Sequence, residues 1–142
     1  MEGLAMAVIT EIIRVNSDGT LSFGNYELSE KTKVLDFEVG GRLYKAKSFK
    51  EVTKLKRDGA LVYESLPGTA VHDFKVTDKE VSFRVEGNTT TQITLELQPK
   101  TEYKLIVDDV IVGNVETTLA GKLIFSVDTN KELKSVKIKR LA

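Results

Sequence analysis

The sequence predicts an all-β protein built as an antiparallel β-sandwich, on two observations. Apolar and polar residues alternate with a period of two through much of the chain, as at Val81, Phe83 and Val85, so each run has one buried and one solvent-facing side. Turn-forming residues separate these runs at short intervals, which is typical of a sandwich or a barrel. After Ser17 no segment has the apolar spacing of three and four residues that predicts a helix.

Residues 1–68 form the first of two expected β-rich halves. The β-branched residues between Val8 and Val15 favour a strand, although Leu4, Val8, Ile12 and Val15 would also suit one stripe of a helix. Two hairpins follow, because glycine-containing dipeptides lie between runs of strand-forming residues. The expected strands are residues 34–39 and 43–49 around Gly40-Gly41, and residues 52–56 and 60–64 around Asp58-Gly59.

Residues 69–142 form the second half, which we expect to be an immunoglobulin-like β-sandwich of about seven short strands. Leu66-Pro67-Gly68 interrupts the sequence before these strands begin, so we place the boundary there. The run from Tyr103 to Val115 is expected to turn back on itself at Asp108-Asp109. The side chains expected in the core are Phe83, Val85, Leu95, Leu97, Leu105, Val107, Leu123, Phe125 and Ile138.

Composition excludes several classes of function. Of 142 residues, 41% are hydrophobic and 30% are charged, as in a globular protein. The 21 Lys and Arg residues balance 21 Asp and Glu residues, so we expect no nucleic acid partner. No run approaches the ~18 apolar residues that span a bilayer, so we expect no membrane partner. The absence of cysteine excludes disulfides, thiolate metal sites and cysteine catalysis.

The start of the chain bears on localisation. Met1–Val15 lacks a basic region followed by a long apolar stretch and a cleavage site, so we expect no signal peptide. A cytoplasmic location is the default expectation, and the mature form of an exported protein would have the same composition. Met6 is an alternative start to Met1.

Catalytic signals are weak. The single histidine, His72, has Asp73 beside it, but adjacent residues on a strand point to opposite faces, so Asp73 is not placed to orient it. Asp108 and Asp109 form a carboxylate pair, for which a hairpin turn is the expected role. Phosphate-binding glycine loops and calcium loops are absent. We therefore expect no catalytic residue, no metal site and no cofactor.

Two turns carry the residues best suited to recognition. Loops tolerate the polar and aromatic side chains that bind ligands, while strands keep the core. Asn25 and Tyr26 follow Gly24 in one such turn, and an exposed tyrosine could stack on a sugar ring. Asp108 and Asp109 occupy the second turn. These four residues are the candidate binding residues.

The segment Thr101–Val127 resembles the β-sandwich modules at the C-termini of polysaccharide-degrading enzymes. The shared pattern is a tyrosine, an alternating strand, a turn and a strand ending in Gly113, then Gly121 and a strand with leucine and phenylalanine. This resemblance implies an accessory role. The whole chain, with Leu61–Asp73, is also similar to short clostridial proteins that carry an endosialidase label, which implies cleavage of polysialic acid. Ser17-Asp18-Gly19-Thr20-Leu21 departs from the sialidase box in its spacing and lacks the tryptophan.

Taken together, these observations favour a non-catalytic β-sandwich module that binds a glycan or a protein partner. Two alternatives remain open. The first is a glycan hydrolase of the endosialidase kind, which would need two converging carboxylates. The second is a structural protein that self-assembles into homo-oligomers through its strand edges.

Overall fold

Thirteen strands and no helix make up residues 8–141, the part of the chain that the computed structural model describes. The expected all-β class is therefore confirmed. In chain order the strands are β1 (Ile13–Val15), β2 (Leu21–Phe23), β3 (Thr32–Val39), β4 (Arg42–Phe49), β5 (Val52–Arg57), β6 (Ala60–Leu66), β7 (Ala70–Val76), β8 (Glu80–Glu86), β9 (Thr90–Glu96), β10 (Glu102–Val107), β11 (Val110–Glu116), β12 (Lys122–Asp128) and β13 (Lys134–Arg140).

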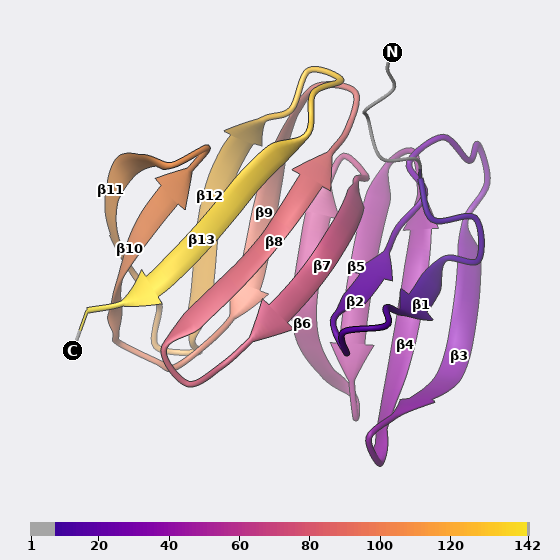
Figure 1. Ribbon diagram of the computed structural model, residues 1–142, viewed down its shortest axis with the longest axis horizontal. Coiled ribbons are helices and arrows are strands. Elements are labelled where there is room, and N and C mark those ends of the chain that lie inside the picture. Colours follow the sequence, from indigo (N-terminus) through magenta and orange to yellow (C-terminus); the bar gives the residue numbers. More distant parts are fainter. Residues whose placement is uncertain (1–7, 142) are drawn as a thin grey trace.

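The strands form two antiparallel sheets that pack as a sandwich. Sheet A has the order β1-β2-β7-β8-β13-β10-β11, and sheet B has the order β12-β9-β6-β5-β4-β3. Figure 1 shows sheet A in front of sheet B, with β11 at one end of the molecule and β3 at the other. The boundary expected at residue 68 falls between β6 and β7, where the chain passes from sheet B to sheet A. Strands from both sides of it share each sheet, since β2 pairs with β7 and β6 pairs with β9.

The expected hairpin turns are confirmed. Asp58 and Gly59 join β5 to β6, and Asp108 and Asp109 join β10 to β11. All four have a positive φ, from 50° at Asp108 to 85° at Gly59. A two-residue turn of this kind matches the twist of the strands that it connects, and aspartate tolerates a positive φ better than most residues do. The seven strands after residue 68 also agree with the expected number.

Both sheets contribute to one hydrophobic core. Seven of the nine side chains expected there are buried; Leu97 and Val107 only pack against the core, because one follows the end of β9 and the other ends β10. At the centre, the Phe23 ring meets the Tyr63 and Phe74 rings edge-to-face, with centroids 5.2 and 5.6 Å apart. This geometry adds to the stabilisation from area burial.

A buried hydroxyl cluster lies beside this aromatic centre. Tyr63 Oη and Ser65 Oγ lie 2.9 and 2.8 Å from Thr69 Oγ1, and Thr53 Oγ1 donates to the Thr69 carbonyl at 2.8 Å. Ser48 joins the cluster through Thr53 at 2.8 Å. Burial raises the pKa of Tyr63, while its hydroxyl partners act in the opposite direction. The cluster fixes the start of β7 against sheet B, because buried polar groups need these partners.

The N-terminal strand is shorter than expected. Only Ile13–Val15 is a strand, because Ile12 has a φ of 72° and its N–H donates to the Ile9 carbonyl, which closes a turn. Leu4 and the two candidate starts, Met1 and Met6, lie outside the described residues. Within residues 8–141 the structure has no helix that is long and apolar enough to cross a membrane.

Candidate functional site

Asn25 and Tyr26 lie in the connection between β2 and β3. The Asn25 side chain is buried, its backbone N–H donates to Ser48 Oγ at 2.8 Å, and its Oδ1 accepts from the Glu27 N–H at 3.0 Å. Asn25 therefore stabilises the turn. Tyr26 is half-buried, and burial, followed by the charges of Glu86 and Glu27, raises its pKa to about 12.

Asp108 and Asp109 form the turn between β10 and β11. Asp108 Oδ1 accepts from the Ser135 N–H at 2.8 Å, and its Oδ2 lies 3.6 Å from Lys134 Nζ. This carboxylate ties the hairpin to β13. In sheet A, β2 and β10 are four strand spacings apart, roughly 19 Å. The structure therefore does not bring the two candidate turns together.

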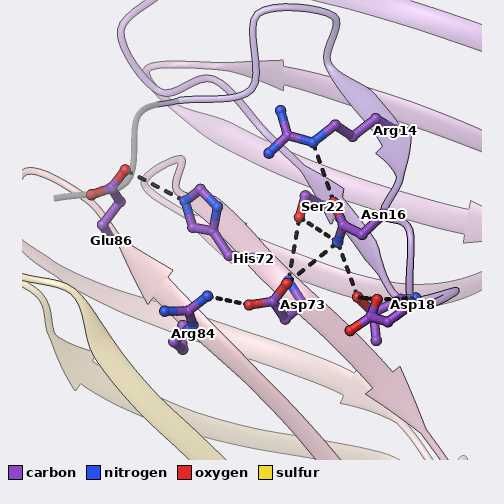
Figure 2. A network of polar contacts seen from close by, with 9 residues as sticks. Arg14, Asn16, Asp18, Ser22, His72, Asp73, Arg84 and Glu86 are labelled. Atoms are coloured by element: carbon purple, nitrogen blue, oxygen red, sulfur yellow. Dashed lines mark hydrogen bonds and ion pairs between the residues drawn. The ribbon is translucent and has the colours of Figure 1, made fainter. Parts of the chain in front are cut away.

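His72 lies beside Glu86, next to a network of polar contacts that links Asp73 to Arg84, Ser22 and Asn16 (Figure 2). It is 1% exposed, and its Nε2 lies 3.6 Å from Oε1 of Glu86, which is 3% exposed. Neither ring nitrogen has a hydrogen-bond partner within residues 8–141. Asp73 instead pairs with Arg84, and its backbone N–H donates to Ser22 Oγ at 3.3 Å. Asp73 therefore does not orient His72, and the carboxylate beside the ring is that of Glu86.

Five lysines on sheet B form a surface that we did not anticipate from the sequence. Their side chains lie on the outer face of the sheet, away from the core, and together with Leu35 they line a shallow hollow of about 310 Å³. We call this surface the lysine face. Its members are Lys33 on β3, Lys45 and Lys47 on β4, and Lys54 and Lys56 on β5.

The strand register aligns these lysines in rows. Lys47 is directly opposite Lys33 on one side and Lys54 on the other, and Lys45 is opposite Lys56. Neighbouring strands are about 4.8 Å apart, and residues two apart along a strand are about 6.7 Å apart. The points at which these lysine side chains leave the sheet therefore form a grid with short, regular spacing.

This arrangement is costly for the folded protein. Like charges directly opposite each other on neighbouring strands destabilise a sheet. Partial burial, followed by the charges of Lys54, Lys31 and Lys33, lowers the pKa of Lys47. Within residues 8–141, the one ion pair that these five lysines form is between Lys54 Nζ and Glu64 Oε2, at 3.3 Å. A surface selected for stability alone would place opposite charges on neighbouring strands, as at Lys54 and Glu64.

The sequence does carry a signal for the lysine face. Lysines recur at a spacing of two in Lys31-x-Lys33, Lys45-x-Lys47 and Lys54-x-Lys56. In the second and third of these, the spacing puts both lysines on one face of a strand, whereas Lys31 precedes β3. Residues 31–57 contain nine Lys and Arg and three Asp and Glu, a local charge of +6. The rest of the chain contains twelve Lys and Arg and eighteen Asp and Glu, a charge of −6. The neutral total conceals this separation.

A second feature is a cleft at one end of the sandwich, between the sheets. A cavity of about 410 Å³ opens there, and a smaller one of about 140 Å³ shares Arg57, Val62, Phe74 and Val76 with it. The larger cavity is also lined by Lys75 and by a single acidic residue, Asp18. The Asp18 carboxylate accepts from the Thr20 hydroxyl at 2.6 Å, which is the main cause of its lowered pKa.

The described part of the chain contains no set of side chains arranged to bind a metal ion. Within residues 8–141 no group of three or more His, Asp or Glu side chains converges in a way that could hold an ion.

No protein-family model, curated protein or solved structure matches the chain. The function is therefore inferred from the chain's own residues.

Proposed function

We propose that the protein is a non-catalytic β-sandwich module that binds an anionic polysaccharide, sulfated or carboxylated, through the lysine face. The observation that supports this most strongly is the alignment of Lys33, Lys47 and Lys54 across three strands. Their mutual repulsion is relieved when anionic groups lie between them. A polymer with regularly spaced charges matches the regular spacing of the grid.

Nucleic acid fits this surface less well. Proteins that bind single strands combine positive charge with aromatic side chains on which the bases stack. The hollow is lined by lysines and by Leu35, and it has no aromatic side chain. Lysine also acts as a point charge, without the planar, bidentate geometry with which arginine recognises bases and phosphates. The surface therefore favours a glycan whose negative charges, not rings, are recognised.

A protein partner also fits less well. The centre of a protein–protein interface is usually apolar, aromatic residues are enriched there, and lysine is depleted. Leu35 is the one apolar side chain that lines the hollow. The immunoglobulin-like character expected for the second half, and its likeness to accessory modules of polysaccharide-degrading enzymes, are consistent with glycan binding and remain part of this proposal.

Dextran sulfate and uncharged dextran test the proposal, because the two polymers differ only in their sulfate groups. We expect dextran sulfate to bind, with an affinity that falls as salt rises, and dextran not to bind. The double variant Lys47→Glu/Lys56→Glu should bind dextran sulfate at least about tenfold more weakly, equivalent to about 1.4 kcal/mol. Isothermal titration calorimetry measures both affinities, and the length of the recovered polymer should be unchanged.

The matched control is Lys104→Glu/Lys137→Glu, which makes the same change of charge on the outer face of sheet A. This variant should keep the dextran sulfate affinity of the wild type within about threefold. Equal losses in the two double variants would show that net charge, and not the lysine face, controls binding. Shortening of the polymer by the wild type would instead support the hydrolase alternative.

Self-assembly is the second candidate, and one observation favours it. The edge strand β11 begins with Val110, Ile111 and Val112, which are 64%, 62% and 61% exposed. The backbone N–H and C=O groups of an open edge can pair with another strand, and exposed apolar side chains on that edge favour the association. Light scattering tests this candidate separately, because strand pairing at β11 does not depend on the lysine face, and a monomer at high concentration would contradict it.

A further inference from the structure

The cleft between the sheets is a second potential ligand site, independent of the lysine face. Its walls come from both sheets, with Val62 on sheet B facing Phe74 and Val76 on sheet A. Its volume of about 410 Å³ lies in the range of roughly 300–1,000 Å³ that small-molecule sites occupy. Val76 is 48% exposed at this end, so the apolar wall is open to solvent.

The charges at this cleft favour an anion. Arg57 at the end of β5 and Lys75 near the end of β7 line the larger cavity from opposite sheets. Neither forms an ion pair within residues 8–141. Asp18 is the one acid that lines the larger cavity, and its carboxylate already accepts hydrogen bonds from the hydroxyl and the N–H of Thr20. Glu96 lines the smaller cavity together with Arg57. The larger cavity is therefore the one that has a cationic charge in excess.

We infer that this cleft binds a small amphiphile with an apolar body and a single carboxylate, such as a medium-chain fatty acid. The apolar chain lies between Val62, Phe74 and Val76, where it replaces water against their side chains. The carboxylate lies at the open end and accepts hydrogen bonds from the Arg57 guanidinium, whose fork geometry matches a carboxylate. Arg57 is the one cation that lines both cavities, and the excess positive charge of the larger cavity places the head group there, away from Glu96 of the smaller one.

Octanoate and 1-octanol test this assignment, because they share a carbon chain and differ in charge. We expect octanoate to bind the wild type, and the affinity to rise about fourfold for each CH₂ added between hexanoate and decanoate. Arg57→Gln should weaken octanoate binding about tenfold and leave 1-octanol binding unchanged. The control Arg140→Gln, which changes a cation that lines neither cavity, should leave both affinities unchanged.

Chemical-shift mapping on the wild-type protein provides a measurement that does not depend on any variant. Octanoate should shift the amide and methyl signals of Val62 and Val76. Absence of octanoate binding at millimolar concentration, shifts confined to other residues, or an unchanged affinity in Arg57→Gln would overturn the inference. The double lysine variant should keep octanoate binding and Arg57→Gln should keep dextran sulfate binding, so failure at one site is distinguishable from failure at the other.

Discussion

Replacing Phe23 with alanine should lower the free energy of unfolding by about 3–5 kcal/mol, the range for removing a large buried aromatic side chain. Phe23 has 0% exposure, and its ring packs edge-to-face against Tyr63 and Phe74. These rings come from β2, β6 and β7, so the cavity left by the substitution lies between the two sheets. Urea denaturation followed by circular dichroism measures the loss.

Phe37 provides the matched control. It is half-buried on the edge strand β3, so Phe37→Ala removes the same atoms from a site that solvent already reaches. We expect it to cost less than half as much as Phe23→Ala. Equal costs, or a cost below about 1 kcal/mol for Phe23→Ala, would contradict the assignment of Phe23 to the centre of the core.

Replacing Gly24 with alanine should cost about 2–6 kcal/mol, the sum of two penalties. Its φ of +103° lies in the left-handed region, where a side chain costs about 1–3 kcal/mol. An added Cβ would lie 2.3 Å from the Thr69 carbonyl oxygen, and forced overpacking costs about 1–3 kcal/mol. Thr69 cannot move away easily, because Thr53 Oγ1 donates a hydrogen bond to its carbonyl and accepts one from its N–H. Thermal unfolding measures the change.

Gly19 separates these two penalties. Its φ is +87°, but an added Cβ would meet no atom within 4 Å. Gly19→Ala therefore carries the backbone penalty alone and should cost about 1–3 kcal/mol. If the two alanine variants lost the same stability, the close approach of Gly24 to Thr69 would have no energetic role.

The parts of the fold that depend on local signals could be predicted from the sequence. The hairpin at Asp58-Gly59 follows from residues that tolerate a positive φ, and the inward faces of Phe83 and Phe125 follow from alternation with polar neighbours. The pairing of β6 with β9 and of β2 with β7 could not be predicted from the sequence. It joins segments far apart in the chain and depends on how the two sheets pack around the whole core.

The candidate site was harder to predict for a related reason. The Lys-x-Lys pairs of β4 and β5 each place two lysines on one strand face, but only the register of β3, β4 and β5 sets Lys47 between Lys33 and Lys54. Asn25 and Tyr26, which were predicted as binding residues, lie in the connection between β2 and β3. The exposure of Tyr26 depends on how this connection packs, because the Asn25 N–H points inward and donates to Ser48 Oγ. Turn chemistry predicted the position of this loop and not which side chains it exposes.

The variant Lys47→Glu tests the central claim most directly, because stability and binding should change in opposite directions. A glutamate opposite Lys33 and Lys54 replaces two repulsive pairs with attractive ones, so the free energy of unfolding should rise by about 1 kcal/mol at low salt. Dextran sulfate affinity should fall severalfold in the same protein. The control Lys137→Glu, whose cross-strand neighbours are Ile106 and Ser82, should change neither quantity appreciably. A Lys47→Glu protein that gains stability and still binds dextran sulfate as tightly as the wild type would contradict the claim that the lysine face is a binding site.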